Sequence, residues 1–241
     1  MKVIVCENYE QVSLEAAKIF AEQIKSNPNG VIGLATGSTP IGMYSALAEM
    51  NKKGEIDFKN IKSYNLDEYY PIEASNDQSY RYFMNENLFS KINIDIKNTH
   101  VLDGMAKDPQ IECDNYEKMI EEAGGIDIQV LGIGQNGHIA FNEPAEKLDA
   151  KTHLTGLTEN TIKANSRFFA SEEDVPKQAL TMGIGTIMKC RKIVIIATGA
   201  AKKNAVAELL SGKIFTGNPS TILNAHSDVT LICDKAAYTN V

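Results

Sequence analysis

The chain alternates short, nearly unbroken apolar runs with longer segments in which apolar residues recur at helical spacing. Unbroken apolar runs are typical of strands that helices cover on both faces, as in a parallel sheet. The pattern therefore predicts an α/β fold, a three-layer Rossmann-like sandwich with a mostly parallel central sheet, in a single domain over residues 1–241. The apolar runs are residues 3–6, 31–35, 61–66, 128–133, 193–198 and 229–233.

Between these runs, apolar residues at helical spacing predict amphipathic helices. Residues 147–174 differ from the rest because they are polar and poor in strand signal, which fits either a mobile lid or a plain surface excursion. The expected buried helix faces are Leu14, Ala17, Phe20, Ala21 and Ile24, then Tyr80, Phe83, Met84 and Leu88, then Cys113, Tyr116, Ile120 and Ala123.

Composition and charge argue against a membrane protein and against a nucleic-acid-binding protein. The chain is 43% hydrophobic and 23% charged, as in ordinary globular domains. No apolar run approaches the roughly 18 residues of a membrane span, and no targeting segment opens the chain, so we expect a cytoplasmic protein with no membrane contact. The net charge of −7 opposes non-specific attraction to nucleic acid, and we expect no such partner. The four cysteines have no CxxC pairing and no His at metal-ligand spacing, so no pattern supports a disulfide framework or a zinc site, and their apolar neighbours predict buried thiols. We expect no metal and no cofactor.

The second apolar run leads into a turn rich in hydroxyl groups, Thr36-Gly37-Ser38-Thr39-Pro40. We expect Thr39 to cap a helix that has Pro40 at its first position. Gly37 permits a sharp turn, and free N–H groups of a first helical turn attract phosphate. A capped turn that binds no ligand is an equally good interpretation. The GxxxxGK[ST] pattern of triphosphate loops is missing, which argues against a triphosphate ligand.

Gly132-Ile133-Gly134-Gln135-Asn136-Gly137 satisfies the GxGxxG pattern of dinucleotide sites. That fingerprint requires a helix directly after the last glycine, so that its N-terminus faces the pyrophosphate. Here Pro144 disfavours helical geometry at Glu143. The sequence therefore argues against a nicotinamide or flavin site.

The same loop carries three polar side chains, Asn136, His138 and Glu143, just beyond a predicted central strand. Ligands of open α/β sheets bind beyond the carboxyl ends of the strands. His138 is suited to proton transfer near neutral pH, Glu143 can stabilise its charged form, and Asn136 can hydrogen-bond. We favour this functional interpretation over a purely structural histidine.

Two adjacent carboxylates, Asp67 and Glu68, follow another predicted strand. Successive residues of an extended segment point to opposite sides, so only one carboxylate can face a cleft. Asp67 directly follows the apolar run, and a partly dehydrated pocket would raise its pKa above about 3.9 and make it a better proton acceptor. A capping or surface carboxylate is the alternative.

Two cations are candidates for binding a phosphate. Arg167 lies between polar and aromatic residues, where a guanidinium could hold an anion with two hydrogen bonds. Lys202 opens a predicted helix after the run at 193–198, and its neighbour Lys203 fits a surface charge better. Ordinary solvated side chains are the alternative for both.

Four blocks of the sequence, at residues 36–40, 65–69, 132–144 and 179–186, resemble the glucosamine-6-phosphate deaminases, a family of sugar-phosphate isomerases. The block at 132–144 is highly specific, and the similarity extends over essentially the whole chain. The related 6-phosphogluconolactonases share the phosphate loop and a Gly-His turn but typically continue into a Ser-Leu-Phe-Pro-like run. A third related class, the sugar-phosphate-sensing domains of transcription regulators, does not need the acid and base residues.

The resemblance implies a metal-free isomerisation and deamination of D-glucosamine 6-phosphate to D-fructose 6-phosphate and ammonia, in amino-sugar catabolism. His138, with Glu143 and Asn136, would move the protons that open the sugar ring. Asp67 would then move a proton between the carbon that bears the amine and its neighbour. The phosphate would bind to Thr36, Gly37, Ser38, Thr39, Arg167 and Lys202.

Two departures from the family pattern shape the expectations. Many relatives have Asp where this chain has Asn136, and an amide holds no negative charge. We therefore expect Asn136 to orient His138 and Glu143 to supply the electrostatic stabilisation. The chain also ends at Val241, short of the tail of hexameric, allosterically activated relatives. This predicts a monomer or small homo-oligomer without that activation.

Overall fold

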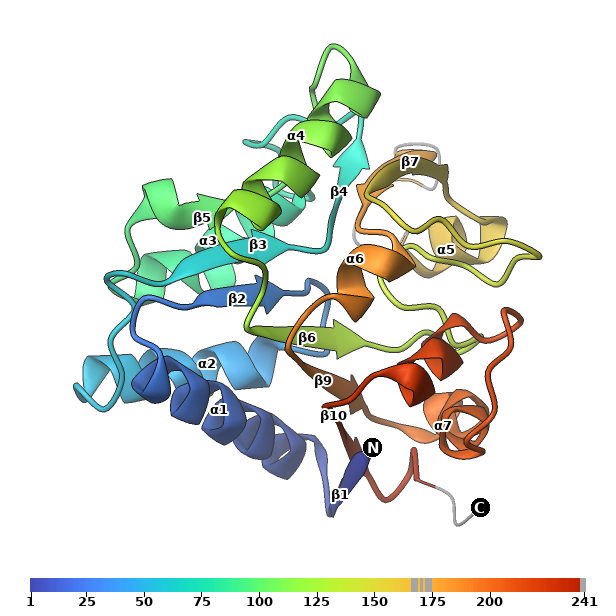
Figure 1. The fold of residues 1–241 in the computed structure, drawn as a ribbon, viewed down its shortest axis with the longest axis horizontal. Helices are drawn as coiled ribbons and strands as arrows, with labels where there is room; N and C mark the ends of the chain where they lie inside the picture. The colour runs from blue at the N-terminus through green and yellow to red at the C-terminus, as the bar shows by residue number, and fades with distance from the viewer. Residues whose placement is uncertain (166–168, 170, 172–174, 239–241) are drawn as a thin grey trace.

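The computed structural model describes residues 1–165, 169, 171 and 175–238. Its centre is a seven-stranded sheet in which every pair of neighbouring strands is parallel (Figure 1). The predicted α/β class with a mostly parallel sheet is confirmed, and each of the predicted apolar runs supplies one strand. In spatial order the strands are β1 (Lys2–Cys6), β10 (Val229–Asp234), β9 (Lys192–Ala197), β6 (Ile128–Gly132), β2 (Val31–Leu34), β3 (Lys62–Asn65) and β5 (Thr99–His100).

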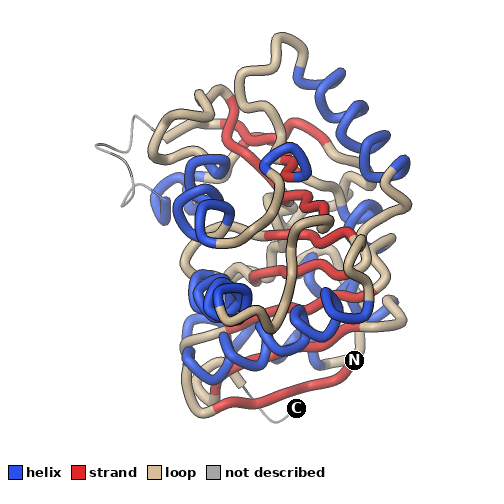
Figure 2. The backbone as a smooth tube through the Cα atoms, turned by 90° about the vertical axis from the view of Figure 1, so that its left-hand side faces the viewer, coloured by secondary structure: helices blue, strands red, loops and turns tan. Residues whose placement is uncertain are grey.

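Helices lie on both sides of this sheet (Figures 1 and 2). Because crossovers between parallel strands are right-handed, connections that run toward β5 place their helices on one face, and connections toward β1 place theirs on the other. The α-helices are α1 (Tyr9–Ser26), α2 (Ile41–Lys52), α3 (Tyr80–Asn87), α4 (Pro109–Glu122), α5 (Glu159–Asn165), α6 (Ile184–Met188) and α7 (Lys203–Leu210). Short 3-10 turns are η1 (Phe89–Lys91), η2 (Ile96–Asn98), η5 (Ala200–Lys202) and η6 (Pro219–Ala225).

The predicted face of α1 is buried except at one position. Leu14 is 48% exposed, because it lies at the edge of the buried arc of the helix. Ser13 takes the buried place and lies directly against Gly42 of α2. The prediction was therefore right for the helix and wrong for Leu14.

A second, three-stranded antiparallel sheet was not predicted. Its strands β4 (Asp67–Tyr70), β8 (Gln178–Thr181) and β7 (His153–Gly156) pair in that order. The segment 147–174, expected to lack strand signal, thus contributes β7 as well as α5. Each strand has only four residues and carries polar side chains, so no apolar run marks it.

The central sheet has a topological switch between two neighbouring strands, β2 and β6. From β2 the chain crosses to β3, whereas from β6 it crosses to β9, in the opposite direction along the sheet. Loops that leave adjacent strands in opposite directions open a crevice at the carboxyl ends of those strands, where open α/β sheets bind their ligands.

Two further findings concern the chain as a whole. Within the described residues, no helix combines the length and apolar character needed to cross a membrane. The four cysteines, Cys6, Cys113, Cys190 and Cys233, are buried free thiols, as their apolar surroundings predict.

Candidate active site

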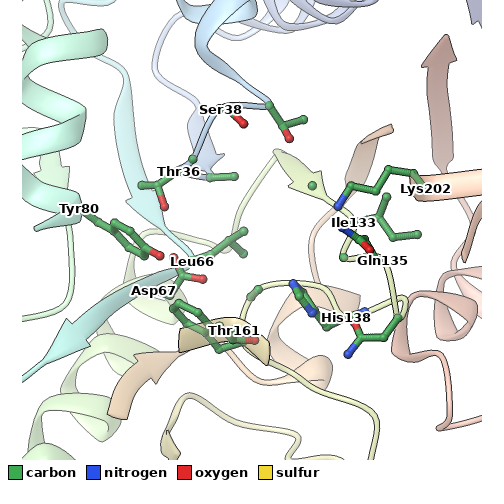
Figure 3. Close-up of a pocket in the computed structure, with 18 of the residues that line it drawn as sticks. Thr36, Ser38, Leu66, Asp67, Tyr80, Ile133, Gln135, His138, Thr161 and Lys202 are labelled. Atoms are coloured by element: carbon green, nitrogen blue, oxygen red, sulfur yellow. Dashed lines mark hydrogen bonds between the residues drawn. The ribbon is translucent and has the colours of Figure 1, made fainter. Parts of the chain in front are cut away.

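A cavity of about 740 Å³ opens at the topological switch (Figure 3). This volume lies within the range of small-molecule sites. The β2, β3 and β6 ends and their loops form most of the wall, and Thr161, Lys163 and Lys202 complete it. The lining residues are Ala35, Thr36, Gly37, Ser38, Thr39, Leu66, Asp67, Tyr80, Gly132, Ile133, Gly134, Gln135, Asn136, His138, Ala140, Phe141, Thr161, Lys163 and Lys202.

Hydrogen bonds from two helices, α1 and α2, fix the loop after β2. The buried hydroxyl of Tyr44 on α2 donates to the carbonyl of Ala35 and accepts the Ala35 N–H. Tyr9 Oη of α1 donates to the carbonyl of Ser38 at 3.0 Å and accepts the N–H of Gly42 at 2.8 Å. Gly37 has a φ of 85°, a conformation that glycine adopts without strain. Two helices therefore fix the course of the loop.

The start of α2 differs from the prediction by one residue. Pro40, not Thr39, is the N-cap residue, and α2 begins at Ile41. Because proline has no side-chain acceptor, α2 has no side-chain cap at all. Thr39 instead lines the cavity beside Thr36 and Ser38.

Lys202 enters the cavity from the opposite wall, as the last residue of η5 (Figure 3). The predicted helix, α7, begins at Lys203, so Lys202 lies at its cap. An ammonium group that faces a loop of hydroxyls and N–H groups favours an anionic ligand. Arg167, the other predicted cation, lies outside the described residues.

Asp67 is the first residue of β4 and lines the cavity with only 7% of its surface exposed. Burial, and then the nearby negative charge of Glu68, raise the pKa of Asp67 from its ordinary value to about 8. A buried carboxylate whose pKa is raised in this way is a strong proton acceptor once it is ionised. Asp67 therefore has the electrostatic character of a general base.

Glu68 points away from the cavity, as the alternation along a strand requires. Its carboxylate is 1% exposed and accepts the backbone N–H groups of Tyr69, Tyr80 and Arg81. Burial raises the pKa of Glu68 to about 7, although these hydrogen bonds oppose the shift. Glu68 thus links the start of α3 to β4, and of the two adjacent carboxylates Asp67 is the one that lines the cavity.

The loop after β6 presents His138. Gly134 N–H donates to the carbonyl of His138 at 2.9 Å, and the imidazole lies so close to Gly134 that a Cβ there would clash with the ring. No helix follows Gly137; a short bridge between Ile139 and Asn142 takes its place. The expectation that no helix opens after the last glycine of this motif is confirmed.

His138, Glu143 and Asn136 lie together. His138 Nδ1 is 3.3 Å from Glu143 Oε1, and Asn136 Nδ2 donates to Glu143 Oε2 at 2.7 Å. Asn136 Oδ1 accepts the backbone N–H of His138 at 3.2 Å. The amide thus contacts the carboxylate and the main chain of the loop, and the carboxylate contacts the imidazole.

Glu143 stays ionised in this arrangement. Burial alone would raise its pKa, but the interaction with His138 and the hydrogen bonds from Thr161 and Asn136 outweigh burial and lower the pKa to about 2. A carboxylate that is negative at every physiological pH stabilises an imidazolium beside it. The pair can therefore hold a proton at His138 during a reaction.

Several cavity residues were not predicted as site residues, and those among them that come from helices are Tyr80, Thr161 and Lys163. Tyr80 was assigned only to the apolar face of its helix, and it does pack against Tyr69 and Phe141. Thr161 and Lys163 come from α5, more than 90 residues along the chain from Asp67. A position on a helix gives no local sequence signal that the side chain belongs to a site.

Among the described residues, no group of three or more His, Cys, Asp or Glu side chains could hold a metal ion.

Comparison with known proteins agrees with the resemblance noted in the sequence. Residues 7–232 match the family model described as glucosamine-6-phosphate isomerases/6-phosphogluconolactonase. The chain is 57% identical over 235 residues to a glucosamine-6-phosphate deaminase from Clostridium beijerinckii, covering 98% of this chain and 97% of that protein. It is 55% identical over 237 residues to the deaminase of Thermoanaerobacter pseudethanolicus, covering 98% and 94%.

Solved structures agree as well. A monomeric glucosamine-6-phosphate deaminase matches with a TM-score of 0.96 at 43% identity, over 98% of both chains. The 6-phosphogluconolactonase of Thermotoga maritima matches with a TM-score of 0.76 at 23% identity, over 97% of this chain and 99% of that one, which is a likeness of fold alone. From the match of the family model and the identity to the deaminases along nearly the whole chain, this protein belongs to the glucosamine-6-phosphate isomerase/6-phosphogluconolactonase family.

Proposed function

We propose that this protein is a cytoplasmic enzyme of amino-sugar catabolism that converts D-glucosamine 6-phosphate and water to D-fructose 6-phosphate and ammonia. The observation that carries the proposal is the gathering, in one cavity, of a buried carboxylate, a histidine that contacts an ionised carboxylate, and an anion-binding wall. The identity of more than half of the residues to proteins named glucosamine-6-phosphate deaminase supports the same reaction.

The reaction divides between the two proton-transfer groups. His138 takes the proton of the anomeric hydroxyl and gives one to the ring oxygen, which opens the ring to the aldehyde. Asp67 removes the proton from the carbon that bears the amine, and an enolamine forms. The same carboxyl returns the proton to the neighbouring carbon, the former aldehyde carbon, which leaves an iminium group beside an alkoxide. One N–H proton then passes to that oxygen, and water hydrolyses the resulting imine to the ketone and ammonia. Each positioned acid or base contributes roughly 10²–10⁴ in rate.

The phosphate binds between the loop of Thr36, Gly37, Ser38 and Thr39 and the ammonium group of Lys202. N–H groups at the start of α2 add the positive end of a helix dipole. Arg167 is proposed to join them, on the family resemblance alone. Anchoring the phosphate holds the open chain within reach of Asp67 and His138, which lowers the entropic part of the barrier.

Lys202→Ala tests the anion-binding wall. We expect the KM for glucosamine 6-phosphate to rise roughly 10–100-fold, the equivalent of one hydrogen bond to a charged group. The kcat should change by less than about threefold, because the lysine does not contact the reacting carbons. Lys203→Ala is the matched control, since Lys203 is exposed and next in the chain. A pure loss of kcat in Lys202→Ala would contradict the phosphate role.

The reaction itself is tested by offering glucosamine 6-phosphate and 6-phosphogluconolactone separately to the pure protein. We expect ammonia and fructose 6-phosphate from the first compound, and no acid release above the spontaneous rate from the second. Acid release alone would indicate a lactonase. Release of neither product would indicate a sugar-phosphate-sensing domain.

We further propose that the protein acts as a monomer without allosteric activation. The solved glucosamine-6-phosphate deaminase that it resembles at a TM-score of 0.96 is described as monomeric, which supports the first part of this proposal. In the same ammonia assay, the rate should then rise hyperbolically with glucosamine 6-phosphate. A sigmoidal curve that N-acetylglucosamine 6-phosphate shifts would contradict this proposal.

A further inference from the structure

Thr161 of α5 connects the segment 147–174 to the polar residues of the cavity. It is 9% exposed and lines the cavity (Figure 3). Its Oγ1 donates to Glu143 Oε1 at 2.6 Å. Glu143 follows β6, whereas Thr161 lies 18 residues further along, after β7. This hydrogen bond therefore joins two elements that are separate in the fold.

The direction of the hydrogen bond is fixed by its surroundings. Glu143 is ionised and can only accept, so the proton on this bond belongs to Thr161. Thr158 Oγ1 donates to Thr161 Oγ1 at 3.0 Å and accepts the N–H of Thr161 at 3.2 Å. The Thr161 hydroxyl thus receives one proton and gives one, which sets its rotamer and aims it at the carboxylate.

The carboxylate of Glu143 is held from two directions. Thr161 binds Oε1 and Asn136 binds Oε2, and the same Oε1 faces His138 Nδ1 at 3.3 Å. His138 is the ionisable group that faces Glu143 in this arrangement. Without the donor from α5, the carboxylate could rotate about its last bond and leave the imidazole.

We propose that Thr161 is a positioning residue for the deamination reaction: its hydroxyl holds Glu143 against His138 and makes this alignment depend on the seating of α5. The inference rests on the proposed function, because it assigns Thr161 a part in the ring-opening step. It also has a consequence independent of any substrate, since the same bond tethers α5 to the body of the protein.

Three variants test whether the Thr161 hydroxyl contributes to kcat. Thr161→Val keeps the shape and removes the donor, and we expect kcat to fall roughly tenfold, the value of one hydrogen bond to a charged group, with KM changed less than about threefold. Thr161→Ser restores the hydroxyl and should return kcat to within about threefold of wild type. Thr155→Val, on neighbouring β7, is the control and should behave as wild type. A wild-type kcat in Thr161→Val, an effect on KM alone, or failure of the serine to rescue would each overturn the proposal.

A double-mutant cycle tests whether the hydroxyl acts through Glu143. In a Glu143→Ala background, the further change Thr161→Val should alter kcat less than about twofold, because the hydroxyl has lost its partner. A second tenfold loss in that background would show that Thr161 acts elsewhere.

Amide hydrogen exchange of residues 159–165 separates this proposal from the reaction itself. Exchange should be faster in Thr161→Val and unchanged in Thr161→Ser, because only the first variant loses the tether. If this exchange pattern is observed but neither the wild type nor any variant releases ammonia, the proposed function is wrong, whereas the link between Thr161 and Glu143 is supported. If ammonia is released and exchange is equal in all variants, the tether is refuted.

Discussion

Asp67→Asn is expected to lower the kcat for ammonia release by about 10³-fold or more while KM changes only a few-fold. The amide has the shape of the carboxylate but cannot take a proton, and general-base catalysis of this kind contributes up to about 10⁴. Glu68 cannot substitute, because three backbone N–H groups hold its carboxylate on the other side of β4. The loss is therefore expected to be nearly complete.

Solvent exchange identifies the step that is lost. In deuterated water, wild-type protein should exchange the proton on the carbon that bears the amine, and Asp67→Asn should not. Asp77→Asn, an exposed aspartate before α3, is the matched control and should exchange at the wild-type rate. Normal exchange in Asp67→Asn would exclude Asp67 as the base.

The same variant should fold at least as well as the wild type, which separates a catalytic loss from a folding defect. The folded-state pKa of Asp67, about 8, lies above the ordinary value of 3.8. The native protein thus binds more protons than the unfolded chain between these values, so the contribution of Asp67 to stability is present below pH 4 and is lost as pH rises to 8. Asparagine has no such dependence. Urea unfolding should show that the stability of Asp67→Asn relative to wild type increases by at least ~1 kcal/mol from pH 5 to pH 8.5.

Most of the central sheet could be predicted because burial on both faces leaves a plain signal. β9 is apolar after Lys192, and β2 and β10 are buried at every residue, so no solvent-facing polar residue interrupts them. β5 gave no such signal, because it has only two residues, Thr99 and His100, at the edge of the sheet. Its pairing with β3 depends on tertiary contacts rather than on a local pattern.

The second sheet could not be predicted for a related reason. A single residue, Leu66, separates β3 from β4, so the two strands read as one run that ends in polar residues. The chain leaves the central sheet at Leu66, whose N–H still donates to Leu34 of β2, and Asp67 then pairs with Thr181 of β8. A change of sheet partner at a single residue leaves no trace in hydrophobic periodicity.

The predicted residues of the candidate site lie after strands, whereas the α-helical residues Tyr80, Thr161 and Lys163 were missed. Asp67 directly follows an apolar run and His138 lies in the loop after another, where the rule for open α/β sheets applies. Thr161 has no such position, and its hydroxyl gains meaning only from Glu143, which the fold brings to it. The Thr39 cap was predicted from residue preference, but Pro40 occupies that place and frees Thr39 to face the cavity.

His138→Gln is expected to lower kcat by roughly 10²–10⁴-fold, through a step different from that of Asp67. Glutamine can still hydrogen-bond Glu143, but it cannot take up and release a proton near neutral pH. Ring opening precedes proton removal, so both ammonia release and solvent exchange should slow together in this variant. Wild-type turnover in His138→Gln would exclude the imidazole from the reaction.

An analogue that cannot close its ring distinguishes the two catalytic groups. A 4,5-dideoxy derivative of glucosamine 6-phosphate lacks the hydroxyls that form the pyranose and furanose rings, so it reaches the cavity as the open aldehyde. His138→Gln should then approach the wild-type rate, because the step that needs the imidazole is bypassed, whereas Asp67→Asn should remain inactive. Both groups line one cavity, so the analogue meets the same phosphate-binding wall in each variant. Equal impairment of the two variants on this analogue would mean that His138 acts after ring opening, on the same carbons as Asp67.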